Sequence, residues 1–299
     1  MRRALAALAV ICALLAAQPA PAARTAPSTI GGCRVFPSGN AWNRDISRAP
    51  VDPRSDEYVR AIGLDANLHP DFGSGRHGDY GIPLTVVPRT QRRVLVRFIA
   101  YPQESDRGPY PIPLGARIEG GSDDHVLVVQ RGTCKLYELF GARRTAQGWE
   151  ADSGARFDLR TGALRPRGWT SADAAGLPIA PGLARAEEVR AGAIRHALRV
   201  TVPRTGRAFR APARHFASNS DDPGLPPMGL RLRLKATYSI RGFHGQARVI
   251  LTALRRYGLI VADNGSPWFV SGTPDRRWKD SDLDQLKRVP GSAFEAVRP

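Results

Sequence analysis

Short apolar segments separated by glycine- and proline-containing turns constrain the fold of this chain more than any other feature of its sequence. Six of them are β-rich or alternate between apolar and polar residues: residues 94–101, 125–131, 135–140, 149–159, 194–202 and 230–237. Residues 259–263 and 268–271 extend the series. Alternation with a period of two is typical of strands that bury one face. The pattern predicts a β-rich α+β fold, an antiparallel β-sandwich or jelly roll with a few peripheral helices.

The helices are indicated by capping residues and by helical spacing. Residues 56–62 follow Ser55 as a cap and end before a glycine. Residues 246–257 place their apolar side chains on one helical face and end at Gly258, and a last helix is expected from Ser281 to residue 288. No internal repeat or long linker interrupts these elements. We therefore expect one globular domain over residues 31–299.

The N-terminus predicts export. Two arginines precede an apolar run, residues 4–17, which is shorter than the roughly 20 residues of a bilayer span, and an A-x-A-like cleavage site follows. Residues 1–23 are therefore expected to be a signal peptide and residues 24–30 a disordered lead. The mature protein would be secreted, either extracellular or on the exterior of the cell envelope. No later segment approaches the length of a membrane span.

Two cysteines, Cys33 and Cys134, remain once the signal peptide is removed. Two thiols in an oxidising compartment are a natural disulfide pair, and this one would close a loop of about 100 residues. Two buried free thiols are the alternative. Neither a C-x-x-C pair nor a zinc-ligand spacing occurs in the sequence.

The chain carries a formal net charge of +17, from 44 basic and 27 acidic residues. Such a surplus usually indicates a polyanionic partner. Almost all of the basic residues are arginine, and the chain is rich in Ala, Gly and Pro. That composition is typical of a GC-rich genome, in which part of the arginine excess lies on solvated faces. No basic run, aromatic-interleaved basic stripe or helix-turn-helix pattern is present, which argues against nucleic acid as a partner.

Several catalytic classes lack their motifs. The sequence contains no G-x-S-x-G elbow for an α/β-hydrolase, and the mature part contains neither H-E-x-x-H nor a P-loop. No cofactor is expected. The metal requirement and the oligomeric state are left open at this stage.

Strand alternation identifies polar residues that face apolar neighbours. His196 shares a face with Ile194 and Leu198, and Glu138 shares one with Leu136 and Phe140. A carboxyl group in apolar surroundings tends to have a raised pKa, as a general acid requires. The alternatives are a core histidine whose hydrogen bonds are satisfied and a glutamate in a structural salt bridge.

A second strand pattern places three cations in a row. Arg231, Arg233 and Lys235 alternate with leucines, so they are expected on one strand face. A groove lined in this way would bind carboxylate- or sulfate-bearing sugars through bidentate contacts. An ordinary solvated strand face is the alternative.

Several loops combine acids, amides and aromatics, which is the mixture that sugar sites use. They contain Glu119 with Asp123, Asp124 and His125; Trp169 with Asp173; Arg214 with His215; and Asp263 with Asn264 and Trp268. A pair of carboxylates would supply the acid and the base or nucleophile of a glycosidase. Aspartates also form ordinary turns and occupy the first turns of helices, and Glu119 with Asp123 could bind calcium instead.

Some motifs carry a family resemblance. They include Trp169-Thr-Ser-Ala-Asp-Ala-Ala-Gly-Leu-Pro-Ile, Pro212-Ala-Arg-His and Ala262-Asp-Asn-Gly-Ser, with Asn40-Ala-Trp-Asn-Arg-Asp-Ile-Ser and Leu136-Tyr-Glu-Leu-Phe. The chain resembles a family of secreted bacterial proteins of unassigned function over nearly all of its mature length. The resemblance implies one continuous domain and no particular activity.

The sequence favours a secreted carbohydrate-active protein, a glycoside hydrolase or a polysaccharide lyase, with a polysaccharide as partner and anionic polymers among the candidates. The expected acid, base or nucleophile residues are Glu119, Glu138, Asp173 and Asp263. The residues expected to position or polarise substrate are His196, His215, Arg214, Asn264, Arg231 and Arg233, and those expected to stack on sugar rings are Trp169 and Trp268. The first alternative is a non-catalytic cell-envelope or polysaccharide-binding protein, and the second is a β-sandwich peptidase that uses carboxyl groups.

Overall fold

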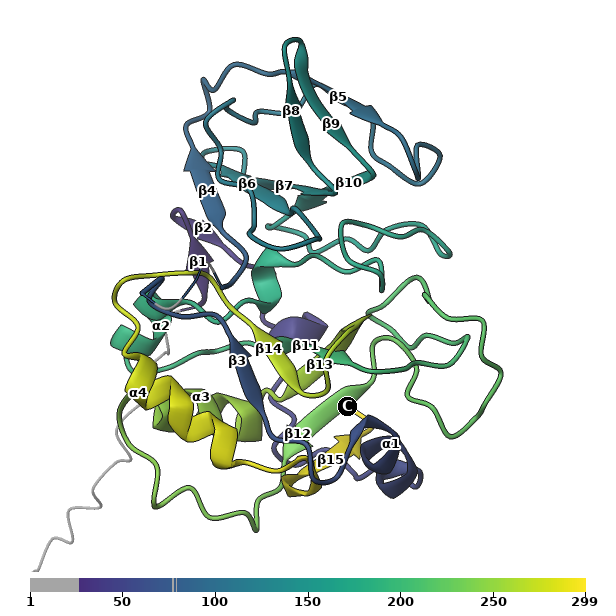
Figure 1. Ribbon diagram of the computed structural model, residues 1–299, viewed down its shortest axis with the longest axis vertical. Helices are drawn as coiled ribbons and strands as arrows, with labels where there is room; N and C mark the ends of the chain where they lie inside the picture. The colour runs from purple at the N-terminus through teal and green to yellow at the C-terminus, as the bar shows by residue number, and fades with distance from the viewer. Residues whose placement is uncertain (1–26, 77, 79) are drawn as a thin grey trace, which may run out of the picture.

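The computed structural model describes residues 27–76, 78 and 80–299. The expected signal peptide, residues 1–23, lies outside the described residues. The fold is β-rich α+β, as the alternating segments predict. Figure 1 shows two stacked lobes, one built from strands β4 to β10 and the other from β3, β11 to β15 and most of the helices.

The upper lobe contains two sheets. The four-stranded sheet has the order β10-β7-β6-β4, and the three-stranded sheet has the order β5-β9-β8. Their bounds are β4 Leu84–Val87, β5 Leu95–Phe98, β6 Val126–Gln130, β7 Lys135–Phe140, β8 Arg143–Thr145, β9 Gly148–Ala151 and β10 Ser153–Asp158. Alternate residues of β6 point to opposite faces: Val126 and Val128 join a core around Trp149, whereas Leu127 and Val129 join the main core shared with the lower lobe. The four-stranded sheet is therefore buried on both faces.

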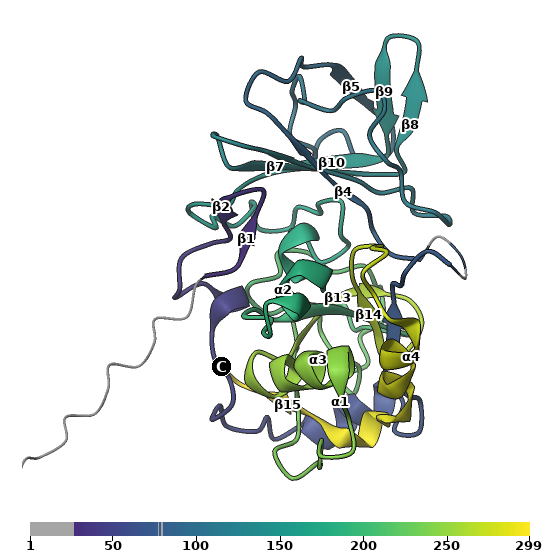
Figure 2. The same cartoon turned by 90° about the vertical axis from the view of Figure 1, so that its left-hand side faces the viewer.

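The lower lobe is built on a six-stranded sheet with the order β15-β12-β13-β11-β14-β3. The strands are β3 His69–Asp71, β11 Leu198–Val202, β12 Arg231–Leu234, β13 Leu259–Asn264, β14 Phe269–Ser271 and β15 Phe294–Val297. The α-helices are α1 Ser55–Ile62, α2 Ala186–Arg190, α3 Gly245–Arg256 and α4 Asp280–Leu283, and the short 3₁₀ helices are η1 Ala41–Asn43, η2 Ala180–Gly182, η3 Asp284–Arg288 and η4 Gly291–Ala293. Figure 2 shows α3 and α4 side by side in this lobe.

Helical and strand periodicities explain how this lobe is assembled. In α3 the buried side chains are spaced three and four residues apart, with Ile250, Leu251 and Leu254 in the main core. In β11 the odd and even positions separate: Leu198 and Val200 enter the same core, whereas Arg199 points to the other face of the sheet. A charged residue in the middle of a buried strand requires nearby groups that stabilise its charge. The residues around Arg199 are therefore the candidate site.

The pairing within the sheets is mixed, which the sequence pattern did not predict. The pairs β4–β6, β5–β9, β11–β13 and β14–β3 are parallel, and the remaining ladders are antiparallel. Alternation reports which face of a strand is buried but carries no information on the direction of its neighbour. The expected strand over residues 149–159 is interrupted at Asp152 and forms β9 and β10.

A disulfide joins the N-terminal segment to the upper lobe. Cys33 and Cys134 are bonded, with their Cα atoms 5.4 Å apart and a sequence separation of 101. Cys33 lies in β2, Cys33–Arg34, which pairs with β1, Thr29–Ile30. The end of the expected disordered lead is therefore ordered, because Ile30 is buried in the main core. A loop of this length gives a chain-entropy stabilisation of about 4 to 5 kcal/mol.

The main hydrophobic core continues from one lobe to the other. It contains Leu127 and Phe157 from the upper sheet together with Val200, Leu232 and Ile250 from the lower lobe. Within the described part of the chain, no helix is long and apolar enough to cross a membrane.

Candidate functional site

The candidate site lies on the face of the six-stranded sheet that carries Arg199. Arg199 of β11 is in register with Ile260 of β13, which is in register with Arg231 of β12. On the other side of β11, Ser271 of β14 is in register with Asp71 of β3. Directly paired residues share a sheet face, so one row of the sheet carries two arginines, a serine and an aspartate.

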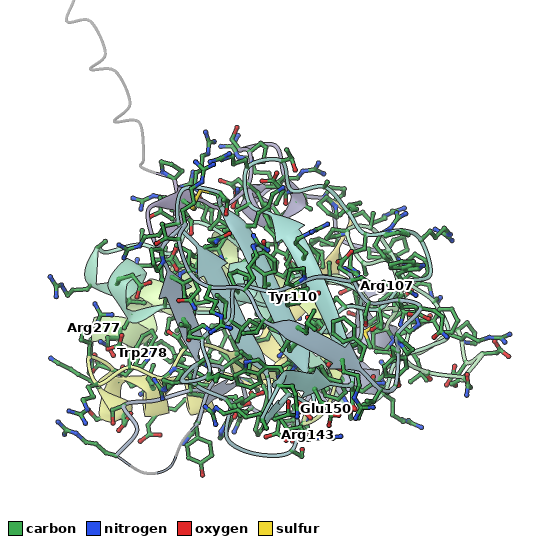
Figure 3. All side chains as sticks on the ribbon, turned by 90° about the horizontal axis from the view of Figure 1, so that it is seen from above. Arg107, Tyr110, Arg143, Glu150, Arg277 and Trp278 are labelled. Carbon is green, nitrogen blue, oxygen red and sulfur yellow. A yellow bond between two sulfur atoms is a disulfide. The ribbon has the colours of Figure 1, made fainter. Side chains whose placement is uncertain are left out.

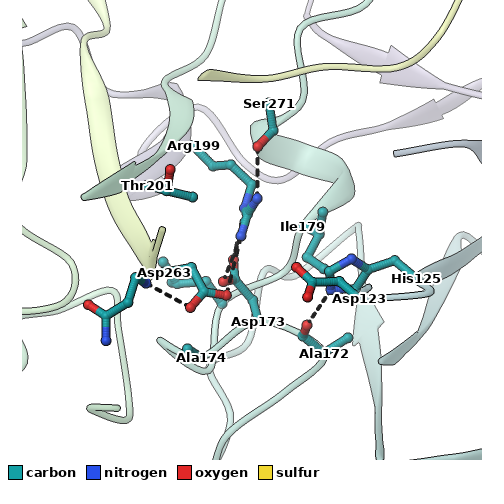
Figure 4. Close-up of polar contacts among 12 residues, drawn as sticks. Asp123, His125, Ala172, Asp173, Ala174, Ile179, Arg199, Thr201, Asp263 and Ser271 are labelled. Atoms are coloured by element: carbon teal, nitrogen blue, oxygen red, sulfur yellow. Dashed lines mark hydrogen bonds and ion pairs between the residues drawn. The ribbon is translucent and has the colours of Figure 1, made fainter. Parts of the chain in front are cut away.

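Arg199 is the centre of this arrangement (Figure 4). It is 5% exposed, and its guanidinium contacts both oxygens of Asp173, with Nη2–Oδ1 at 3.1 Å and Nε–Oδ2 at 3.3 Å. Nη1 donates to Ser271 Oγ at 2.7 Å, and Nη2 lies 3.6 Å from Asp263 Oδ2. The bidentate contact fixes the plane of the guanidinium and compensates its burial. The nearby carboxylates raise the pKa of Arg199 despite its burial.

Asp173 is positioned by a segment that we call the connector loop, residues 169–179. The connector loop joins the lobes through hydrogen bonds: Ser153 Oγ of β10 donates to Ser171 O at 2.7 Å, and Ala175 N donates to Ala262 O of β13 at 3.1 Å. The Asp173 amide donates to Ser171 Oγ at 2.9 Å. The connector loop is therefore a buried junction at which the lobes meet.

Glu119 and His125 reach the site from the loop before β6. The His125 ring is buried and bonded at both nitrogens, with Nδ1 against the Glu119 carboxylate and Nε2 donating to Ala172 O at 2.9 Å. Two acceptors at one imidazole favour its doubly protonated form. Burial alone would lower the pKa of His125, but the hydrogen bond and charge of Glu119 raise it. Burial alone would raise the pKa of Glu119, but the hydrogen bond and charge of His125 and the charge of Arg199 lower it.

Glu138 lies beneath the connector loop. Its side chain is fully buried and accepts hydrogen bonds from Ile179 N at 3.0 Å and Ala180 N at 2.9 Å, where η2 begins. Burial raises the pKa of Glu138 to about 7; the two amide hydrogen bonds oppose this shift and the Asp173 charge adds to it. Glu138 therefore contacts the C-terminal end of the connector loop and is closed to solvent.

Asp263 combines a raised pKa with access to solvent. Burial, followed by repulsion from Asp173, raises its pKa to about 7, although Arg199 opposes the shift. Its side chain is 26% exposed. Oδ1 accepts from the Asn264 amide at 2.8 Å, which fixes the carboxyl at the end of β13. A carboxyl group that is half protonated near neutral pH and reaches solvent can donate a proton to a bound molecule.

Asp71 is a further acid of the site. It is half-buried, and burial together with the charges of Glu119 and Asp123 raises its pKa, while Arg199 lowers it. We call Asp71, Glu119, Glu138, Asp173 and Asp263 the acid cluster. Asp71 escaped sequence reasoning because His69-Pro70-Asp71 shows no alternation. The sequence signal for Arg199 is its position between two apolar strand residues, Leu198 and Val200.

The sequence brought forward four candidate acids, and the structure places all four in the acid cluster. Other predicted site residues lie elsewhere. His196 is fully buried against Glu188, with Nε2 to Oε2 at 3.0 Å, in a network with Arg185. Trp268 is also fully buried, donates to Gly63 O at 2.7 Å and stacks on Phe294, so it offers no face to a sugar ring.

The remaining predicted residues support the loops around the site. Trp169 lies over Arg165, with the guanidinium 5.5 Å from the ring centroid, and Arg214 Nε donates to Arg165 O at 2.8 Å. His215 Nδ1 lies 2.9 Å from Ala174 O. The amide of Asn264 accepts from Thr205 Oγ1 at 2.9 Å, which ties down the loop after β11.

The expected cationic groove on β12 is not formed. Arg231 and Arg233 are 3% and 8% exposed, and Arg233 is neutralised by Glu295 at 2.6 Å. Lys235 is half-buried and donates to Ser292 O at 2.8 Å. The face of the strand that the sequence assigned to solvent is covered by the N-terminal segment, whose Ile46 and Ala49 carbonyls accept from Arg233. Alternation distinguishes two faces but cannot show that a distant segment covers the polar one.

No group of three or more His, Cys, Asp or Glu side chains suited to a metal ion occurs in the part of the chain that the structure describes. Comparison of the chain with protein-family models, with curated proteins and with solved structures finds no match. The proposed function therefore rests on the acid cluster itself.

Proposed function

We propose that this protein is a secreted carbohydrate-active enzyme, a glycoside hydrolase or polysaccharide lyase, whose reaction takes place at the acid cluster. The arrangement that carries the proposal is the set of carboxyl groups around Arg199. Asp173 contacts the guanidinium, and Asp263 Oδ2 lies 3.6 Å from Nη2. In this arrangement the pKa of Asp263 is raised to about 7 and the pKa of Glu119 is lowered. Carboxyl groups whose environments separate their pKa values are the usual acid and base of such enzymes.

Three acids of the cluster surround Arg199. Arg199 interacts electrostatically with Asp173, Asp263 and Glu119. Asp173 and Asp263 approach the same nitrogen, Nη2, at 3.1 and 3.6 Å. The Asp173 charge therefore lies close enough to Asp263 to raise the pKa of that carboxyl group, which favours Asp263 as the proton donor.

The protonation state of each residue would determine its role in the reaction. Asp263 would protonate the glycosidic oxygen as the sugar leaves. Glu119, held ionised by His125, would activate water or attack the sugar in a hydrolase, or remove the proton next to a uronate carboxyl group in a lyase. Asp173 would act as a positioning residue, because it orients Arg199 and its charge raises the pKa of Asp263.

The expected export of the protein supports an extracellular substrate. The N-terminal pattern predicts export, and a disulfide such as Cys33–Cys134 is stable in an oxidising compartment. A cell-wall or environmental polysaccharide is then the substrate that the protein would meet.

The test is incubation of the purified protein with a panel of bacterial, plant and algal polysaccharides. New reducing ends support the enzyme, and absorbance near 235 nm from unsaturated products distinguishes a lyase from a hydrolase. A panel that stays intact while the protein co-sediments with one polymer would replace the proposal with a non-catalytic binding protein. The net charge of +17 favours that second candidate, and its binding should weaken steeply with salt.

A further inference from the structure

A cavity of about 510 Å³ lies away from the acid cluster, between η1, the connector loop and the C-terminal strand β15. Its size is typical of pockets that hold small organic ligands. Apolar side chains form much of its wall, among them Phe36, Trp42, Phe157 and Leu177. The connector loop contributes Gly176, Leu177 and Pro178 to the lining, whereas no residue of the acid cluster lines the cavity.

The charged residues that line this cavity are arginines: Arg44, Arg165, Arg210, Arg231 and Arg298. No aspartate or glutamate among the described residues lines it. Two of the arginines have carboxylate partners outside the lining, since Arg165 pairs with Asp106, and Arg210 pairs with Asp52 at 2.7 Å. We call this cavity the arginine pocket.

Arg231 stands out among the buried arginines. Five arginines are buried in the described chain, and four of them pair with a carboxylate: Arg165 with Asp106, Arg185 with Glu188, Arg199 with Asp173 and Arg233 with Glu295. Arg231, which is 3% exposed, forms no ion pair within the described residues. Arg233, which lies on the same strand face, has a carboxylate partner in Glu295.

The partners of Arg231 are neutral carbonyl oxygens. Nε donates to Tyr257 O at 3.1 Å, Nη1 to Ala41 O at 2.9 Å and Nη2 to Arg44 O at 3.5 Å. Three of the five guanidinium N–H groups are used in this way. A buried cation without a counter-ion is strongly unfavourable. Burial and the charge of Arg44 accordingly lower the pKa of Arg231 to about 9.

We propose that the arginine pocket binds a small ring-bearing carboxylate of the uronic-acid type, whose carboxylate is the counter-ion of Arg231. A guanidinium recognises a carboxylate through two parallel hydrogen bonds, and Arg44 adds a second positive charge. The apolar wall contacts the ring. This binding site is independent of the acid cluster and of the proposed activity.

Isothermal titration with sodium glucuronate tests the proposal, with glucose as the neutral ligand of the same size. The expected result is saturable binding of glucuronate that is at least tenfold tighter than binding of glucose and that weakens with added salt. Equal affinity for the two sugars would overturn the proposal. Inorganic phosphate provides a further arm: binding as tight as that of glucuronate would reduce the pocket to an unspecific anion site and would also overturn the assigned ligand class.

Variants locate the binding. Arg231→Met removes the buried charge, and Arg44→Gln removes a charge from an exposed residue whose loss should leave folding intact. Ala163→Trp fills the cavity from an exposed lining position. Each is expected to weaken glucuronate binding tenfold or more, whereas the matched control Arg241→Gln, an exposed arginine outside the pocket, should bind as the wild type does. Wild-type affinity in both Arg44→Gln and Ala163→Trp would refute the location, even if Arg231→Met fails to fold.

Failure of the two proposals can be distinguished. Asp263→Asn should retain glucuronate binding at the arginine pocket, since Asp263 does not line it. Binding of glucuronate without cleavage of any polysaccharide would support the arginine pocket and refute the proposed enzymatic function.

Discussion

Individual residues of the acid cluster obtain their properties from burial and from one another's charges. Glu138 illustrates the cost of burial: no cation among the described residues contacts its carboxyl group, and two backbone amides compensate part of its charge. Asp263 has the same raised pKa but reaches solvent. Under the proposed function, this difference in access assigns Glu138 a supporting role and Asp263 the role of general acid.

Glu138→Gln should change the pH dependence of stability. The pKa of Glu138 rises from 4.5 to about 7 on folding, so the folded state holds a proton that the unfolded state loses between these values. The wild type should therefore lose up to about 3 kcal/mol of unfolding free energy relative to Glu138→Gln as the pH rises from 4 to 8. Urea denaturation at both pH values measures this difference. A constant difference would contradict the assignment, and exposed Glu57→Gln is the control.

The pH dependence of catalysis should report Asp263. A general acid must be protonated, and its pKa of about 7 means that kcat/KM for the polymer should fall tenfold per pH unit above this value. Glu119, with its lowered pKa, must be ionised, so it should limit activity only in the acidic range. Initial rates measured from pH 4 to 10 give the profile. Activity that stays constant from pH 6 to 9 would remove Asp263 from the role of acid.

At the scale of elements, the connector loop requires a glycine at a position of close backbone approach. Gly176 has φ +68, and a Cβ atom there would collide with the Trp169 carbonyl, which is backbone and cannot move aside. Gly168 has a similar φ of +84, but a Cβ atom there would meet nothing within 4 Å. Only glycine adopts this conformation without strain.

Gly176→Ala should therefore destabilise the protein well beyond Gly168→Ala. The control carries only the cost of a positive φ, roughly 1 kcal/mol, whereas Gly176→Ala adds a collision and should cost about 3 kcal/mol or more. Thermal unfolding of the two variants measures the contrast. Equal losses would show that the connector loop rearranges at no cost and does not hold Asp173 in place.

The sequence predicted the elements better than their assembly. Strand β7 and helix α3 follow from alternation and helical spacing, and the four acids followed from their positions in loops or against apolar neighbours. The parallel strand pairs could not be predicted, because no local pattern specifies the neighbour of a strand. Arg199 and Asp71 were not proposed as site residues, since only the sheet brings β11 and β3 to one site.

At the scale of the whole molecule, the main core and the disulfide both connect segments far apart in the sequence. We therefore expect the two lobes to unfold together, and scanning calorimetry should show one transition whose calorimetric and van't Hoff enthalpies agree. Two separable transitions would show that the lobes are independent domains.

Charge is also distributed over the whole molecule. Some exposed arginines are paired, as Arg143 is with Glu150 at 2.6 Å (Figure 3). Exposed pairs of this kind contribute little to stability and are screened by salt. We therefore expect the excess positive charge to act on the rate of encounter with polyanions rather than on stability.

The most direct test of the account is the turnover of a cleaved polysaccharide by the wild type, by Asp263→Asn and by the control Asp65→Asn, an exposed aspartate outside the cluster. Removal of a general acid costs roughly 10² to 10⁴ in rate. Asp263→Asn should therefore lose at least 10²-fold in kcat with an unchanged unfolding temperature, and Asp65→Asn should keep the wild-type turnover. Wild-type turnover by a folded Asp263→Asn protein would place the chemistry outside the acid cluster.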